Sequence, residues 1–313
     1  MVARLLWEQD VAGSNPVIPT NSGIHKAFEY QKRGFDRKIE AAKQEYFAAL
    51  FLKGNESMDM EKNLTIEEIE AIIGEEPIFY LKFTSKESFA NDVVEGKLYA
   101  NTPEWFRNKE LDTGEHGQGD KNELQYTMPL FSIRFINPET GNCDFELPHA
   151  NGRIAFKDDD KLPLVCFVGI SLHEMRIISQ TPETMEIALP FSESEYSDMG
   201  KRFGEYCVIV EAKALIERLQ QYCNDNSCQY ILKRVTYCVS NYKEKVEAFA
   251  NGSTDRFFYK DEDFAYQREY RLVLSREIPD DHFIRIAPLK DKAVIVKSDQ
   301  LSNLCLCIKS PLA

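Results

Sequence analysis

The sequence lacks any long hydrophobic run. No stretch reaches the roughly 18 apolar residues that a membrane-spanning helix needs. The first residues also lack a basic head followed by an apolar segment, which is the pattern of a secretory signal peptide. These two absences predict a cytoplasmic protein without membrane contacts.

Positive charge is also scarce. Lysine and arginine number 38 against 51 aspartates and glutamates, which gives a formal net charge of -13. This balance argues against a protein that coats nucleic acid, although it leaves room for a small local basic groove. Hydrophobic residues make up 43% of the chain, which is enough to build the core of a globular protein.

Motifs for bound metals and nucleotides are missing as well. None of the eight cysteines forms a Cys-x-x-Cys pair, and several lie in apolar runs, so reduced core thiols are expected rather than disulfides or zinc ligands. The glycine-rich stretch 112–123 lacks the Lys-Ser/Thr of a phosphate-binding loop and is expected to be a mobile surface loop. Its residues His116, Asp120 and Glu123 are a weak ligand set, so no metal site is expected.

Three regions are expected along the chain. Residues 1–23 are expected to lack ordered structure, 24–62 to form a helix and a linker, and 63–313 to form a single α+β domain. The helix over 24–53 rests on apolar residues spaced mostly three, four or seven positions apart, namely Ile24, Phe28, Phe35, Ile39, Ala42, Tyr46 and Leu50.

The first twenty residues carry a resemblance of a different kind. Gly13–Pro16 is what the T-arm consensus of a transfer-RNA gene encodes, and Val2–Thr20 resembles translated transfer-RNA sequence at the start of over-extended bacterial reading frames. The resemblance implies that translation starts later, at Met58 or Met60. It also implies a gene on a mobile element, because such elements land at transfer-RNA genes and gather toxins and phage-defence genes.

Strand-like segments outnumber helix-like ones and do not alternate with them regularly. This order predicts an α+β fold with a mixed, mainly antiparallel sheet and flanking helices. Pro163–Ser171 is the most apolar strand candidate and is expected at the centre of the sheet. The other expected strands are Pro77–Phe83, Lys97–Ala100, Thr127–Ile136, Glu186–Pro190, Gly204–Glu211, Gln229–Tyr237, His282–Ala287, Ala293–Val296 and Leu304–Ile308. One expected helix begins at a cap, Thr84 or Ser85, and ends at Val94. The other expected helices are Ser192–Arg202, Ala212–Tyr222 and Tyr242–Phe249, with a helical turn that starts at Pro103.

One stretch late in the chain places three polar residues at the start of an apolar, β-prone run. It reads Gln-Arg-Glu-Tyr-Arg over 267–271. Residues i and i+2 of a strand share a face, so Gln267, Glu269 and Arg271 would point the same way if the strand starts early. Burying an amide, a carboxylate and a guanidinium together is costly without a reason. The stretch is therefore either a site or a solvated Glu–Arg pair on an exposed face.

The order of the segments over residues 77–276 resembles an uncharacterised bacterial domain family. The residues that carry the resemblance are Phe79–Phe83 with Gly96–Ala100, Cys166 and Phe167 with Ser171, Phe203–Cys207, and Gln267–Arg271. The same order is similar to that of ADP-ribosyltransferase-like toxins, which carry a Ser or Tyr in the middle and a Gln-x-Glu or Glu-x-Glu near the end. This resemblance implies an ADP-ribosyltransferase-like core and NAD as substrate.

The implied chemistry explains the residue types. Cleavage of the nicotinamide–ribose bond passes through an oxocarbenium-like state, which a nearby carboxylate stabilises. By the resemblance Glu269 would be that catalytic carboxylate, and Gln267 would position the acceptor. The expected cofactor-binding residues are Tyr80, Lys82, Arg134, Ser171 and Arg271.

Most of the cofactor-binding residues also have a purely structural interpretation. Tyr80 would stack on nicotinamide or else be a core or rim aromatic. Lys82 or Arg134 would hold the diphosphate or else be a solvated strand charge. Ser171 would contact the cofactor or else cap the turn that follows it.

Three functions stay open at this point. The first is an ADP-ribosyltransferase-like effector, a toxin or anti-phage protein that uses NAD to modify nucleic acid or protein and is paired with an antitoxin protein. The second is a non-catalytic partner-binding protein of a mobile element, with contacts through residues 24–53 and the loop 112–123. The third is a metal-dependent nuclease with the ligands Asp112, Glu115, His116, Asp120 and Glu123.

Overall fold

The protein is seen in a computed structural model, which describes residues 3–5, 76–114, 117–171, 174–181 and 184–309. The expected helix over 24–53, the two candidate start residues Met58 and Met60, and the loop residues Glu115 and His116 lie outside the described residues. Ala3–Leu5, within the segment expected to lack structure, forms a short strand, β1.

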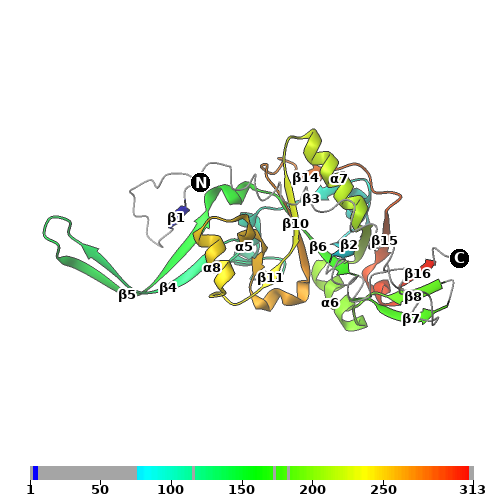
Figure 1. Ribbon diagram of the computed structural model, residues 1–313, viewed down its shortest axis with the longest axis horizontal. Coiled ribbons are helices and arrows are strands. Elements are labelled where there is room, and N and C mark those ends of the chain that lie inside the picture. The colour runs from blue at the N-terminus through cyan, green and yellow to red at the C-terminus, as the bar shows by residue number, and fades with distance from the viewer. Residues whose placement is uncertain (1–2, 6–75, 115–116, 172–173, 182–183, 310–313) are drawn as a thin grey trace, which may run out of the picture.

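A six-stranded sheet forms the centre of the fold (Figure 1). Every pair of neighbouring strands in it is antiparallel, so the predicted α+β class with a mainly antiparallel sheet is confirmed. The strand order is β10 (Tyr230–Arg234), β13 (Glu269–Leu274), β6 (Leu164–Ser171), β2 (Pro77–Thr84), β9 (Tyr206–Glu211) and β15 (Ala293–Lys297). The most apolar predicted strand, β6, lies in the interior of the sheet as expected.

The two faces of this sheet carry separate hydrophobic cores. On one face, Tyr80, Phe167 and Leu272 pack against two helices, α4 (Glu87–Val94) and α7 (Ala212–Asp225). On the other face, Leu81 and Val168 pack against α6 (Glu193–Phe203) and the 3-10 helix η5 (Ser298–Asn303). Because side chains alternate along a strand, adjacent residues of β2 belong to different cores.

The remaining elements surround this centre. The helices are α5 (Pro103–Thr113), α8 (Lys243–Ala250) and the 3-10 helices η1 (Lys157–Lys161), η3 (Thr254–Phe258) and η4 (Glu262–Gln267). The short strands pair as β3 (Lys97–Tyr99) with β14 (Phe283–Arg285), and β11 (Thr236–Tyr237) with β12 (Tyr259–Lys260); a third sheet contains β7 (Arg176–Gln180), β8 (Thr184–Ala188) and β16 (Cys305–Lys309). None of the described helices has the length and hydropathy that crossing a bilayer requires.

Local signals explain where two of the helices begin. Ser192 caps α6 in a capping box with Glu195, and Thr102 caps α5 ahead of a proline at the first helical position. The predicted cap of α4 is wrong. Thr84 donates to the Lys86 carbonyl instead, and the N-cap residue Lys86 makes no side-chain cap.

A long hairpin projects from the body, at the end of the molecule opposite the β7–β8–β16 sheet (Figure 1). It consists of β4 (Tyr126–Ile136), which was expected, and β5 (Cys143–Phe156), which was not. Strand β5 contains Pro148, Asn151 and Gly152, residue types that sequence rules place in turns. Long-range pairing with β4 overrides that local preference.

Two acidic segments that were predicted to be solvated are partly buried. In the stretch 112–123, Gly119, Asp120 and Glu123 are buried, and a Cβ atom at Gly119 would meet the backbone nitrogen of Glu110 at 2.5 Å. In the acidic turn after β5, Asp159 is buried as well. Only glycine allows the first segment to approach α5 this closely. The buried carboxylates of Glu123 and Asp159 each find a cationic partner.

Candidate functional site

The Gln-x-Glu-x-Arg stretch is buried. The helix η4 ends at Gln267, and Arg268 takes a left-handed conformation (φ 46°) that turns the chain into β13. Glu269 and Arg271 then lie two residues apart on β13 with 3% and 1% of their surfaces exposed. The prediction that the three polar side chains come together is met, although Gln267 reaches the others from the helix rather than from the strand.

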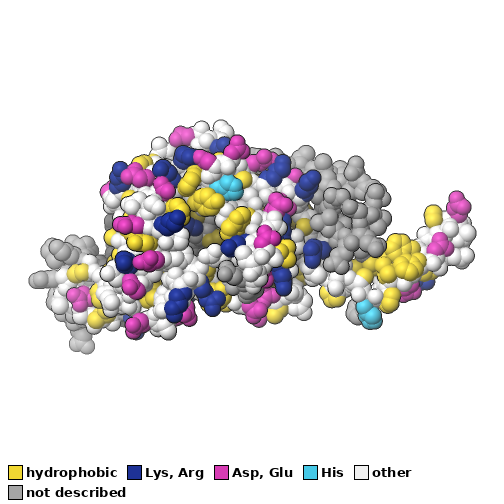
Figure 2. Space-filling view, turned by 180° about the vertical axis from the view of Figure 1, so that it is seen from behind, with side chains coloured by type: hydrophobic (Ala, Val, Ile, Leu, Met, Phe, Trp, Pro, Cys, Tyr) yellow, Lys and Arg dark blue, Asp and Glu magenta, His cyan; other side chains and the backbone are white. Residues whose placement is uncertain are grey.

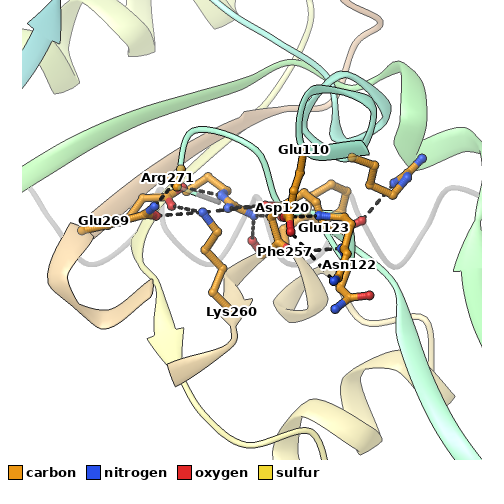
Figure 3. A network of polar contacts seen from close by, with 12 residues as sticks. Glu110, Asp120, Asn122, Glu123, Phe257, Lys260, Glu269 and Arg271 are labelled. Carbon is orange, nitrogen blue, oxygen red and sulfur yellow. Dashed lines mark hydrogen bonds and ion pairs between the residues drawn. The ribbon is translucent and has the colours of Figure 1, made fainter. Parts of the chain in front are cut away.

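Arg271 is the centre of a network of charged side chains (Figure 3). Its Nε donates to Glu269 (2.7 Å), and its two terminal nitrogens donate to the carboxylate of Glu123 (2.7 and 3.2 Å). One of them also donates to the Phe257 carbonyl (2.7 Å). Two carboxylates from distant segments therefore share one guanidinium, in the planar geometry that arginine favours.

Lys260, from β12, completes the network. Its ammonium donates to Glu269 (3.0 Å) and to the side-chain oxygen of Gln267 (2.9 Å), and it lies 3.8 Å from Glu123. The amide nitrogen of Gln267 in turn donates to the Gly117 carbonyl (2.7 Å). The cluster thus contains two cations, two carboxylates and an amide, all buried and all hydrogen-bonded, which is the condition under which buried charge is tolerated.

Mutual attraction shifts the titration of these groups. Burial opposes the ionisation of Glu269, but Arg271 and Lys260 outweigh it and hold the pKa of its carboxyl well below the usual range. Burial alone would lower the pKa of Lys260, yet Glu269 and Glu123 raise it above its ordinary value. A carboxylate held ionised by two cations is a weak base, so this arrangement suits a fixed charge better than a proton acceptor.

Asp120 stands beside the network without a cation of its own. Its side chain accepts the backbone N–H of Asn122 (2.9 Å). Burial, and then the nearby charge of Glu123, raise the pKa of Asp120 to about 6 against an ordinary 3.8. The titration of Asp120 therefore falls near neutral pH.

Further buried ion pairs tie down the two ends of the hairpin. Glu123 lies just before β4, and its carboxylate is held by Arg271 as described above. Just after β5, Asp159 receives two hydrogen bonds from Arg256 (2.7 and 2.6 Å), and the neighbouring Asp160 binds Arg107 (2.6 Å). Arg107 also donates to the Glu123 backbone (2.9 Å), so both ends of the hairpin connect to one polar network.

The structure does not bring the predicted cofactor-binding residues of β2 to Glu269. Glu269 pairs with Val168, which pairs with Leu81, so these three share one face of the sheet. Tyr80 and Lys82 point to the other face, where Tyr80 contacts the rings of Phe167 and Tyr270 in the core. Lys82 donates to the Cys166 carbonyl (2.9 Å), and burial lowers its pKa.

Of the other three predicted cofactor-binding residues, Arg271 belongs to the network, whereas Arg134 and Ser171 lie apart from it. Arg134 lies exposed on β4, near the turn of the hairpin, 3.8 Å from Glu146. Ser171 ends β6 and is buried, and both its hydroxyl and its backbone N–H donate to the carboxylate of Glu174. A role for these residues in binding NAD stays a prediction.

Of the five ligands considered for a nuclease, Glu115 and His116 lie outside the described residues. Among the residues that the structure describes, no group of three or more His, Cys, Asp and Glu side chains is placed to hold a metal ion. Glu123 is already occupied by Arg271. A cavity of about 480 Å³ lies elsewhere, lined by apolar residues that include Phe79, Ile209 and Val296.

The far part of the hairpin exposes an apolar face. Ile133 and Phe135 of β4 pair with Leu147 and Phe145 of β5, so the four side chains share one side of the ribbon. The Phe135 and Phe145 rings lie 5.7 Å apart and are 44% and 55% exposed. Figure 2 shows this group as a yellow patch on the projecting arm. We call these four residues the arm face.

Sequence reasoning missed Lys260, Arg256 and the arm face. Lys260 follows three aromatic residues and precedes an acidic run, and only the folded chain shows that its ammonium reaches Glu269. The arm face could have been found by extending the alternation of β4 into the residues after the turn at 137–142. Comparison of the chain with protein-family models, curated proteins and solved structures finds no significant match.

Proposed function

We propose that this protein acts by binding a protein partner through the arm face. The observation that supports the proposal is a cluster of four apolar side chains on a hairpin that extends away from the body (Figures 1 and 2). Three of them, Phe135, Phe145 and Leu147, are exposed, and Ile133 is partly exposed. Exposed apolar clusters of this kind, with polar residues around them, are typical of protein-binding surfaces. In this form of the partner-binding hypothesis, the arm face makes the contacts that the sequence assigned to the loop 112–123.

The anchoring of the hairpin supports the same proposal. Tyr126 and Phe156, at its base, pack against Phe249 of α8, and the buried ion pairs of Glu123 and Asp159 hold its two ends. A base fixed in this way limits the conformational entropy that the arm loses when it binds.

The charges around the arm face indicate the chemistry of the partner. Between residues 134 and 147 the hairpin carries one base, Arg134, and three acids, Glu139, Asp144 and Glu146. Arg134 and Glu146 face the opposite side of the ribbon from the arm face. The excess of acids on the arm repels a phosphate backbone, which disfavours nucleic acid as the partner. The matching surface is an apolar site of a protein.

A photo-crosslinking experiment tests the proposal. A photoreactive amino acid is placed at Leu147, on the arm face, or at the neighbouring Glu146, whose side chain points to the opposite side of the ribbon. Cells that express the protein at native level should give one discrete protein adduct from position 147 and none from position 146.

A variant pair sharpens the experiment. In the background with the probe at 147, F135S together with F145S should abolish the adduct, whereas R134A should retain it. Equal adducts from both probe positions would contradict the proposal. An adduct between two copies of the chain would show that the arm face binds a second copy of this protein and not a different partner.

ADP-ribosyl transfer is a second candidate. It is favoured by the position of Glu269 two residues after Gln267, since both side chains accept hydrogen bonds from the ammonium of Lys260. NAD as substrate, Glu269 as the carboxylate that stabilises the oxocarbenium-like state, and a nucleic-acid or protein target paired with an antitoxin belong to this candidate. The side chains of Lys260 and Arg271 already bind Glu269. A ribose would therefore have to displace Lys260 to reach the carboxylate.

NAD turnover separates the two candidates. Purified protein is incubated with NAD, and released nicotinamide is measured for wild type, E269Q, and the exposed control E277Q, whose partner Lys161 lies 2.9 Å away at the surface. ADP-ribosyl transfer predicts turnover that E269Q abolishes and E277Q retains. Turnover in a folded E269Q variant would contradict the role assigned to Glu269. If neither the wild type nor any variant turns over NAD, ADP-ribosyl transfer is excluded and partner binding is the remaining candidate.

A further inference from the structure

Helix α7 ends in a turn that brings two cysteines together. Ser227 has a left-handed conformation (φ 50°), the Cys228 N–H donates to the Cys223 carbonyl (3.0 Å), and the Ser227 N–H reaches the Asn224 carbonyl (3.5 Å). These two bonds, six-to-one and five-to-two, define a Schellman motif. In this motif the residues at the positions of Cys223 and Cys228 contact each other, and here both are thiols.

The two sulfur atoms lie 3.6 Å apart, and the Cys228 thiol donates a hydrogen bond to the Cys223 sulfur. Cys223 is buried, whereas Cys228 is partly exposed. Beside them Arg276 binds the Asn226 side chain (2.7 Å), which places a cation at the same turn. The pair thus has one shielded thiol, one thiol within reach of solvent, and a turn that holds them in contact.

We propose that Cys223 and Cys228 are a peroxide-oxidised dithiol that closes to a disulfide. The proposal is independent of the function of the arm face and of Glu269. The sulfurs need to approach by about 1.5 Å to reach disulfide bonding distance. Since the two residues already meet at the end of one helix, side-chain rotation is the motion required.

The reaction proceeds in two balanced steps. The Cys228 thiolate attacks a peroxide oxygen, so that an S–O bond forms, the O–O bond breaks, and water leaves after protonation. The Cys223 thiol then displaces the hydroxyl of the sulfenic acid, which forms the S–S bond and releases a second water. Both sulfurs are oxidised, and the peroxide is the two-electron acceptor.

Exposure assigns the order of attack, because Cys228 is within reach of solvent and Cys223 is buried. The contact between the two thiols acts in the same sense, since it lowers the pKa of Cys228 and raises the pKa of Cys223. Because the thiolate is the nucleophile, the exposed member reacts first and the buried member resolves it.

Peptide mapping tests the proposal in the full-length protein. Trypsin releases Leu219–Lys233, which contains Cys223 and Cys228 and no other cysteine, and Ser298–Lys309, which contains the exposed Cys305 and Cys307 as an internal control. After reduction, removal of the reductant, brief treatment with hydrogen peroxide, and alkylation, the first peptide should lose two hydrogens and resist alkylation. Dithiothreitol should restore both thiols.

The control peptide should behave differently. Cys305 and Cys307 lie two residues apart on an extended strand, about 6.6 Å along the backbone, which does not hold two sulfurs in contact. These thiols should remain open to alkylation under the same brief treatment. Full alkylation of Leu219–Lys233 while the control peptide is oxidised would overturn the proposal, as would a disulfide that joins two copies of the chain.

Single variants test the order of the steps. In C223S, Cys228 should stop at the sulfenic acid and be trapped by a dimedone probe. In C228S, the buried Cys223 should stay reduced. A C223S protein that gives no trapped sulfenic acid, or a C228S protein that oxidises as fast as wild type, would overturn the assignment.

Discussion

In most proteins charged side chains lie at the surface and phenylalanines lie in the core. The buried network around Arg271 and the arm face depart from this pattern in opposite ways. The network places four charged groups inside the protein, and the arm places two phenylalanines at its surface. The charges are acceptable because each finds partners, whereas the phenylalanines stay exposed because no described residue covers them. The first departure is resolved within the chain, and the second calls for another molecule.

The two regions are also connected in sequence. Glu123 and Asp159 lie just outside the two ends of the hairpin, and both are held by buried arginines. The charged side chains thus anchor the hairpin, while the apolar ones are free to bind. This division makes a testable difference: damage to the network should lower stability, and damage to the arm face should lower binding.

Removal of the central arginine should have the largest effect. In R271M the carboxylates of Glu123 and Glu269 stay buried but lose the guanidinium that holds both of them. The free energy of unfolding should therefore fall by about 3–5 kcal/mol. Denaturant unfolding measures it. The matched control is R285M, which removes an exposed arginine paired with Asp281 and should leave unfolding close to wild type.

Hydrogen exchange would sharpen the same comparison. R271M should speed amide exchange at the start of β4, next to Glu123, more than in β9 on the far side of β2. If R271M unfolds like wild type, the network contributes nothing to anchoring the arm, and the comparison of the two regions fails.

Asp120 should make stability depend on pH. Its pKa is raised to about 6 from an ordinary 3.8, so between these values the folded protein binds more protons than the unfolded chain. Stability is therefore lost as pH rises from about 4 to 6, by at most about 3 kcal/mol for two pKa units. D120N should match wild type near pH 4 and exceed it at pH 8.

Thermal and denaturant unfolding at the two pH values measure this difference. The lowered pKa of Glu269 acts in the opposite direction, because it removes stability below its ordinary pKa; it is common to both proteins and cancels in their difference. A D120N effect of the same size at both pH values would show that Asp120 does not titrate in this window.

Substitution of the arm face should have the smallest effect on stability. The two phenylalanines form an exposed cross-strand pair, so F135S with F145S should change the free energy of unfolding by less than about 1 kcal/mol. The same double variant should lose the crosslinked partner. A large loss of stability would mean that the arm face packs within the protein, and would contradict its role as a binding surface.

Much of the fold could be predicted from local patterns. Apolar runs located β6 and β13. The strand β5 was missed because its proline, asparagine and glycine favour turns, and only pairing with β4 makes it extended. Local propensity is weak evidence where long-range pairing decides the conformation.

The candidate site was predicted in part, for a similar reason. The spacing of Gln267, Glu269 and Arg271 indicated that they meet, because that spacing lies within one segment. It could not show that Lys260 and Glu123 join them, since those contacts cross segments 9 and 148 residues apart in the sequence. Nor could it show that Tyr80 lies on the opposite face of the sheet from Glu269, because the register between strands decides that.

The sequence by itself determined the class of fold, the central strands and the grouping of polar residues at the start of β13, because those properties depend on neighbours along the chain. The tertiary structure alone decided that these charges would be buried and paired, that the hairpin would project with an apolar face, and that two cysteines would meet at the end of α7. Pairing and burial depend on which distant segments pack together, and that choice belongs to the whole chain rather than to any stretch of it.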